Sequence, residues 1–96
     1  MSYYFIAQIK ITNEQEYRKY TDRTDEVFKK FKGRYLAVDN QPQLLEGNWN
    51  YTRIVLITFE SRGDFRDWYN SDEYQEILKH RLAGSQCDSL LVKGLM

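Results

Sequence analysis

The sequence predicts an α+β fold whose elements follow the order β-α-β-β-α-β. Three observations lead to this order. Residues 3–11 and 51–60 alternate their side chains as strands do, and residues 17–31 repeat apolar side chains at helical spacing. A second helical stretch, starting near residue 61, precedes a last strand at 87–93. Right-handed crossovers place both helices on one face of a four-stranded antiparallel sheet, which is the ferredoxin-like sandwich.

The first strand and the first helix carry the clearest patterns. One face of strand 3–11 is apolar and is assigned to the core, while the other face is apolar at one end and polar at the other. Asn13 and Glu16 have capping-box spacing at the start of the helix, and Gly33 is the expected C-cap. The helix is expected to bury one stripe of side chains, namely Tyr17, Tyr20, Thr24, Val27, Phe28 and Phe31.

The middle of the chain holds a short strand at 34–39, a further extended piece at 44–46 and a strand at 51–60. The centre of the last of these is apolar on both faces, which is typical of a strand covered on both sides. The helices cover only one face of the sheet. We therefore expect a second copy to cover the other face, so that two sheets close into a dimeric α+β barrel.

The second helical segment is predicted in two pieces. Ser61 and Asp64 form one capping pair, the chain breaks at Asn70, and Ser71 caps the next piece, which ends near Gly84. The apolar stripe expected for this last piece is Tyr74, Ile77, Leu78 and Leu82.

Length and composition limit the function. A chain of 96 residues is expected to form one domain, residues 1–96. Its 14 basic and 14 acidic side chains cancel, which argues against nucleic-acid binding. We expect no membrane span and no signal peptide, and the single Cys87 fits a reducing, cytoplasmic location.

Several blocks resemble the bacterial "domain of unknown function 1330" family. They are Gly33–Leu36, Leu45–Trp49, Arg53–Ser61, Trp68–Gln75, Arg81 and Val92–Gly94. The resemblance covers nearly the whole chain, implies the dimeric α+β barrel superfamily and brings no agreed activity with it. Two positions depart from the family pattern. Val38-Asp39-Asn40 stands where the family typically has Arg-Gly-Gly, which removes a positive charge near the sheet, and Asp72 replaces a proline.

His80 is the candidate catalytic residue. Its neighbours Lys79 and Arg81 favour a helix-surface or interface position instead. Haem-degrading members of the barrel superfamily use a helical His with a nearby Trp, and this likeness is the reason to consider His80 together with Trp68. One His and one Cys do not supply a metal cluster, and no glycine-rich phosphate loop is present in the sequence, so we expect no metal and no cofactor.

Six side chains are candidates for ligand binding. Trp68, Tyr69 and Tyr74 surround the helix break; at least two are expected in the core, and one is a candidate for lining a pocket. Arg53 and Arg81 either form structural ion pairs or hold a ligand carboxylate. The expected ion-pair partners are Glu46, Glu60 and Glu73.

Gln8 is the sixth candidate, and it would point into the barrel if its face of the sheet is the dimer side. The sequence thus predicts a homodimer that binds a small aromatic or carboxylic metabolite in a cleft at the sheet. The alternative is a cofactor-independent isomerase, decarboxylase or monooxygenase, and it is based only on enzymes of these types that share the barrel fold.

Overall fold

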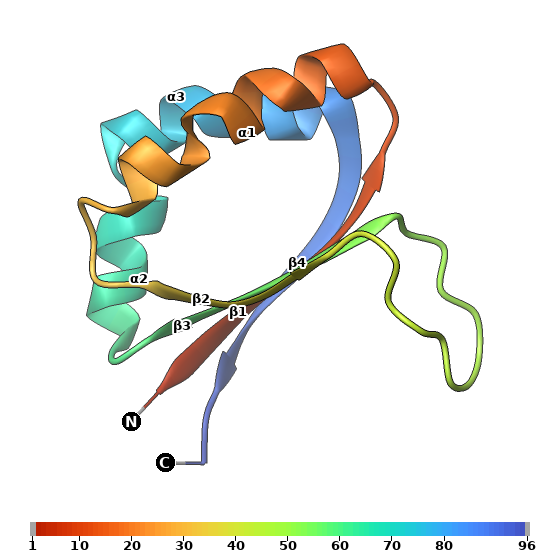
Figure 1. Ribbon diagram of the computed structural model, residues 1–96. Coiled ribbons are helices and arrows are strands. Elements are labelled where there is room, and N and C mark those ends of the chain that lie inside the picture. Colours follow the sequence, from red (N-terminus) through yellow and green to blue (C-terminus); the bar gives the residue numbers. More distant parts are fainter. Residues whose placement is uncertain (1, 96) are drawn as a thin grey trace.

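A computed structural model describes residues 2–95 and confirms the predicted order of elements (Figure 1). The second helical segment is divided in two, as expected. The elements are β1 (Tyr3–Ile11), α1 (Glu14–Phe28), β2 (Arg34–Asp39), β3 (Arg53–Phe59), α2 (Arg62–Tyr69), α3 (Asp72–Gly84) and β4 (Ser85–Lys93).

The four strands form one antiparallel sheet in the order β2-β3-β1-β4, and the helices lie on one of its faces (Figure 1). The predicted ferredoxin-like α+β architecture is therefore correct. In the register of β1 and β3, Ala7 lies opposite Val55 and Ile9 lies opposite Arg53. These side chains consequently share the helix-covered face, because residues directly opposite in a pair of strands point the same way.

All three predicted N-caps are present. The Asn13 side chain accepts a hydrogen bond from the Glu16 backbone N–H at 3.1 Å. Ser61 accepts one from the Asp64 N–H at 3.0 Å, and Ser71 accepts one from the Tyr74 N–H at 3.1 Å. Each cap satisfies one of the backbone donors that a helix start leaves without an intrahelical partner.

The structure corrects two predicted element ends and one predicted strand. Helix α1 ends at Phe28, well before Gly33. Gly33 serves packing instead, since a Cβ there would lie 2.6 Å from the rings of both Phe28 and Phe59. Residues 44–46 form an exposed loop in place of an extended piece, and β4 begins at Ser85 in place of Cys87.

A further correction concerns the buried stripe of α3. The predicted position Leu82 is 59% exposed, and the neighbouring Arg81 is only 2% exposed. The face that α3 turns toward α1 and the sheet therefore includes a cation in the place where the sequence pattern favoured a leucine. This exchange brings Arg81 into the interior.

Packed aromatic rings fill one half of the space between the helices and the sheet. Trp68 is at their centre, with its ring centroid 4.2 Å from that of Tyr74 and 5.5 Å from that of Phe59. Phe28 meets Trp68 edge-on at 5.6 Å. Such contacts contribute beyond the area that they bury. We call this group, with Phe5 and Phe65, the aromatic half of the core.

The opposite face of the sheet, which we call the outer face, is covered by no helix of residues 2–95 (Figure 1). Its apolar side chains are partly or largely exposed, and they are Tyr4, Ile6, Leu36, Ile54, Leu56, Leu90 and Val92. The loop between β2 and β3 stands away from the body (Figure 1) and is tied to this face by hydrogen bonds from Trp49 to Gln8 at 2.9 Å and from Tyr51 to Asp88 at 2.5 Å. Within residues 2–95, no helix is long and apolar enough to cross a membrane.

Candidate functional site

A cavity of about 310 Å³ occupies the other half of the space between α1 and the sheet. Its floor is the helix-covered face of β1 and β3, where the small Ala7 lies between Phe5 and Ile9. Its roof is α1, which contributes Tyr17, Tyr20, Thr21, Thr24 and Asp25. Tyr35, Val38, Arg53, Val55, Ile57 and Arg81 complete the lining.

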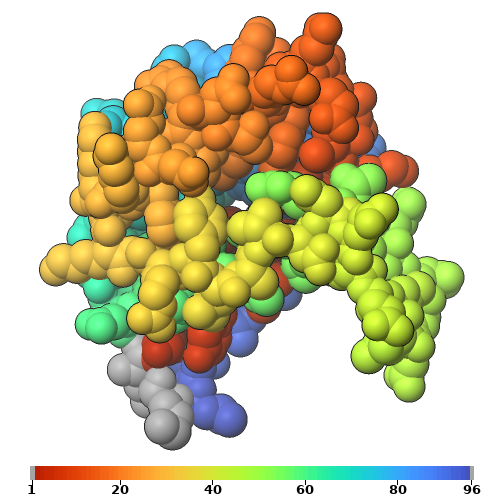
Figure 2. Space-filling view, in the orientation of Figure 1, coloured from red at the N-terminus to blue at the C-terminus, as the bar shows by residue number. Residues whose placement is uncertain are grey.

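The cavity opens beside the edge strand of the sheet. Figure 2 shows a hollow in the surface between α1, in orange, and the yellow segment that contains β2. Asp25 of α1 and Val38 of β2 line the cavity and are both exposed. A second hollow of about 440 Å³ shares Tyr17, Thr21 and Arg53 with it. A small molecule would therefore reach the interior without displacing a secondary-structure element.

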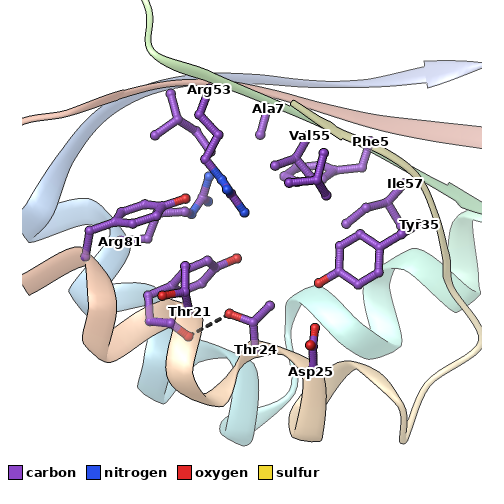
Figure 3. Close-up of a pocket in the computed structure, with 14 residues that line it drawn as sticks. Phe5, Ala7, Thr21, Thr24, Asp25, Tyr35, Arg53, Val55, Ile57 and Arg81 are labelled. Atoms are coloured by element: carbon purple, nitrogen blue, oxygen red, sulfur yellow. Dashed lines mark hydrogen bonds between the residues drawn. The ribbon is translucent and has the colours of Figure 1, made fainter. Parts of the chain in front are cut away.

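Two guanidinium groups lie at one end of the cavity, each over an aromatic ring. The Arg53 Cζ is 5.9 Å from the centre of the Tyr17 ring, and the Arg81 Cζ is 5.8 Å from the centre of the Tyr20 ring. The two rings are themselves 5.7 Å apart. Figure 3 shows Arg53 and Arg81 on one side of the cavity and Tyr35 on the other. These contacts hold the arginines by cation–π attraction.

No carboxylate among residues 2–95 forms an ion pair with Arg53 or Arg81. The expected pairing with Glu46, Glu60 or Glu73 is thus wrong, and Glu73 pairs with Lys30. The Arg53 Nη1 donates to the Asn40 Oδ1 at 3.0 Å, and the Arg81 Nη1 donates to the Cys87 Sγ at 2.9 Å. Both partners are uncharged side chains.

Unpaired donors gather at the same end. Four buried side-chain N or O atoms lack a hydrogen-bond partner within the described part of the chain: the Tyr17 hydroxyl, the Nε atoms of Arg53 and Arg81, and the Trp68 Nε1. All but the last belong to residues that line the cavity. Buried polar groups are nearly always paired, so three orphans at one place call for an explanation.

The phenols around the cavity are neutral near pH 7. Burial raises the pKa of Tyr17 to about 12, although the nearby Arg53 acts in the opposite direction. Burial also raises the pKa of Tyr20, whose hydroxyl lies 2.8 Å from that of Tyr74. A neutral phenol is a hydrogen-bond donor, so the Tyr17 hydroxyl adds a donor to those of the two arginines.

The structure separates the six residues that the sequence singled out for ligand binding. Only Arg53 and Arg81 line the cavity. Trp68 lies in the aromatic half of the core, and Tyr74 is fully buried against it. Gln8 points to the outer face, where its side chain accepts the hydrogen bond from Trp49.

Tyr69, the remaining member of the six, is partly buried and stacks on Phe65 at 5.3 Å. The candidate catalytic residue His80 lies away from the cavity lining. Its Nδ1 is 2.6 Å from the Glu16 Oε2, a contact that joins α3 to α1 and lowers the pKa of Glu16. The surroundings of His80 are those of a side chain that links two helices.

Sequence reasoning missed the tyrosines of α1 as site residues and assigned them to the core. A signal was present, because Arg53 shares the inward alternation of Val55 and Ile57 and so places a cation opposite the inward stripe of α1. Residues 38–40, which depart from the family pattern, also lie at or beside the site. Val38 lines the cavity, and Asn40 holds Arg53.

Three solved structures illustrate the likeness in fold. A protein of unknown function from Rhodopseudomonas palustris matches with a TM-score of 0.82 and 16% identity, covering 99% of this chain and 83% of that one. A dimeric ferredoxin-like protein of unknown function from Jannaschia sp. CCS1 matches at 0.79 and 8% identity, covering 98% and 100%. SnoaB, a cofactor-independent oxygenase from Streptomyces nogalater, matches at 0.69 and 14% identity, covering 99% and 94%.

At such identities these likenesses concern the fold alone. No curated protein matches the sequence. The family model described as Domain of unknown function (DUF1330) matches residues 2–95, which include β1 through β4 and every residue that lines the cavity. On this match, the chain belongs to the DUF1330 family.

Proposed function

We propose that the protein is a homodimer that binds a small aromatic or carboxylic metabolite in the cavity beneath α1. The observation that carries the binding proposal is the cavity itself. Its volume of about 310 Å³ falls at the lower end of the range of small-molecule sites. Its floor is apolar, and its two cationic groups lie together at one end, a combination of apolar walls and placed polar groups that is usual in a binding pocket.

A ligand screen tests the binding proposal. A true ligand stabilises the native state by mass action, so thermal shift against a library of aromatic and carboxylic metabolites should give hits that raise the melting temperature in a concentration-dependent way. Backbone amide resonances of Ala7, Val55 and Thr24 should then shift on titration. Hits whose shifts map to another part of the surface would contradict the proposal.

The dimer proposal is supported by the outer face of the sheet. This face carries several partly or largely exposed apolar side chains, and monomers rarely expose large contiguous apolar patches. Beside it, Leu44, Leu45 and Trp49 of the loop form an apolar hollow of about 560 Å³ with Ile54. The neighbour from Jannaschia is described as dimeric, which fits two sheets meeting face to face.

Sedimentation at micromolar concentration tests the dimer, with an expected mass near twice 11.6 kDa. Leu90→Asp should give a monomer, because Leu90 is an exposed residue of the outer face. Leu82→Asp is the matched control: Leu82 is exposed to the same degree, 59% against 60%, but on α3. A monomeric wild type, or equal effects of the two substitutions, would contradict a dimer through the outer face.

A second candidate is a cofactor-independent enzyme of the isomerase, decarboxylase or monooxygenase type. Two guanidinium groups without a carboxylate partner in the described chain favour it, because such groups stabilise an oxyanion that develops during a reaction. SnoaB, which shares the fold, is a cofactor-independent oxygenase. A confirmed ligand is incubated with the protein, with and without oxygen, and mass spectrometry should detect a product. An unchanged ligand would contradict catalysis and leave binding as the only supported function.

A further inference from the structure

We infer that the ligand carries a carboxylate, which binds between Arg53, Arg81 and Tyr17 while an apolar body lies along the sheet. The inference rests on the proposed function, since it concerns the same cavity. It decides between the aromatic and carboxylic classes by requiring the acid group. It also assigns Asn40 as a residue that positions Arg53.

The charge of Arg81 is the first support. Arg81 is only 2% exposed, yet no carboxylate within residues 2–95 forms an ion pair with it. Its contacts are the Cys87 thiol and the face of Tyr20, both uncharged. A buried cation without an anion is costly to the folded state. A bound anion would remove that cost.

The orphan donors supply the geometry. The Nε atoms of Arg53 and Arg81 and the Tyr17 hydroxyl belong to residues that line the cavity, and they have no partner in the described chain. A carboxylate has two oxygens, each with two acceptor positions, so it has enough acceptor positions for all three donors once their side chains turn toward it. Asp25 lines the opposite side (Figure 3), so charge alone directs the acid group toward the arginines.

A carboxylate suits this site better than a phosphate. Phosphate sites typically use backbone N–H groups of a helix start or a glycine-rich loop. Here the start of α1 is closed by the Asn13 cap, and none of residues 13–16 lines the cavity. The floor beyond it, formed by Ala7, Val55 and Ile57, is apolar. An acid with an apolar or aromatic body therefore matches both parts.

Asn40 positions the more accessible arginine. Its Oδ1 accepts from the Arg53 Nη1 at 3.0 Å, which leaves the remaining N–H groups of Arg53 for a ligand. Asn40 itself does not line the cavity and is exposed at the end of β2. A negative charge at this position would compete with a ligand carboxylate for Arg53.

Pairs of acids and their neutral amides test the inference. We would titrate the protein with 2-naphthoate and 2-naphthamide, and with benzoate and benzamide, using calorimetry for affinity and amide spectra for location. Within at least one pair, the acid should bind about tenfold or more tightly than the amide, since hydrogen bonds to charged groups are the stronger ones. Both members should shift the resonances of Ala7 and Val55.

Two variants with matched controls assign the preference to the named residues. Arg53→Gln should reduce the preference for the acid while the amide still binds; Arg62→Gln should keep it, since Arg62 also lies over a tyrosine ring, Tyr3, but away from the cavity lining. Asn40→Asp should weaken acid binding, and Asn48→Asp, which adds the same charge on the exposed loop, should do so far less.

The outcomes separate this inference from the proposed function. Equal affinity for acid and amide, with shifts at Ala7 and Val55, would overturn the carboxylate inference and leave binding in the cavity standing. A preference for the acid that survives Arg53→Gln would overturn it too. If no member of either pair shifted these resonances, the cavity would not be a site for such molecules, and the carboxylate inference would fall with the proposed function.

Discussion

The space between the helices and the sheet has two halves that differ in how they are filled. In the aromatic half, Trp68 is 1% exposed and its ring centroid lies 4.2 Å from that of Tyr74. In the cavity half, the floor is Ala7 and Val55, and about 310 Å³ remain open. Both halves rest on the same strands. Along β1, Phe5 belongs to the aromatic half, and Ala7, two residues later, belongs to the cavity floor.

This contrast separates stability from binding. Close-packed rings bury apolar surface and hold α2 and α3 on the sheet. The cavity half instead keeps open space and unpaired donors, which lower the stability of the free protein. We infer that the aromatic half supplies the rigidity that lets the cavity half stay open.

The largest expected effect is that of Trp68→Ala. Removing the central ring of the aromatic half should lower the free energy of unfolding by roughly 3–5 kcal/mol. Tyr17→Phe, in the cavity half, should change it by less than about 1 kcal/mol, because it removes a hydroxyl that has no partner in the described chain. Denaturant unfolding of both variants measures the contrast, and similar losses would contradict it.

Gly84→Ala comes next, because the cavity half is held together by backbone contacts. A Cβ at Gly84 would lie 2.7 Å from the backbone N of Tyr17, and the Gly84 carbonyl accepts hydrogen bonds from the N–H groups of Thr12 and Asn13. Forcing these backbones apart should cost about 1–3 kcal/mol of unfolding free energy. Gly63→Ala is the control, since its nearest contact would be at 3.7 Å; an equal loss there would point to a different cause.

Enlarging one side chain in each half sharpens the comparison further. Val27 is a core residue outside the cavity lining, and Val55 lines the cavity. Val27→Leu should destabilise the protein by about 1 kcal/mol or more through overpacking, whereas Val55→Leu extends into open space and should cost less than that. Thermal and denaturant unfolding measure both. A larger loss for Val55→Leu would mean that this part of the floor is already full.

A last difference appears only at alkaline pH and is absent near neutrality. The pKa of Tyr17 is about 12 in the folded protein and near 10 when unfolded, so the phenol is neutral in both states below pH 10. Below pH 10, the contribution of Tyr17 to stability is therefore fully present. Between about pH 10 and 12 only the unfolded state loses the proton, so the contribution of Tyr17 to stability should fall by roughly 1.4 kcal/mol per pH unit. Tyr20, Tyr35 and Tyr74, whose pKa values burial also raises, add to the decline of the wild type. Tyr17→Phe should flatten the decline measured by denaturant unfolding at pH 9, 10 and 11; an unchanged slope would contradict this.

The fold was predictable because several local patterns agree. Asn13, Ser61 and Ser71 each start a helix as their capping pattern indicates, and the alternation of β1 and β3 divides their side chains between the two faces of the sheet. The end of α1 was not predictable in this way. Gly33 is required by contacts with Phe28 and Phe59, which lie apart in sequence, and local pattern does not report such contacts.

The candidate site was predictable only in part. Arg53 and Arg81 were singled out by charge, but their ion-pair partners were assigned wrongly because a sequence does not say which carboxylates lie within reach. Arg81 and Leu82 both fit the helical stripe, and apolar character favoured the leucine. A cavity is space that the packed side chains leave unfilled, and a sequence does not report how its side chains pack.

The sheet separates the cavity from the outer face, and this has a consequence for stoichiometry. Each cavity is lined within residues 2–95 of one chain. A dimer closed through the outer face would therefore hold two sites, separated by both sheets and by the side chains on their outer faces. Ligand occupancy should then follow a simple hyperbola with one molecule per chain. A monomeric Leu90→Asp variant should bind with the affinity of the wild type, which makes assembly and occupancy separately adjustable properties.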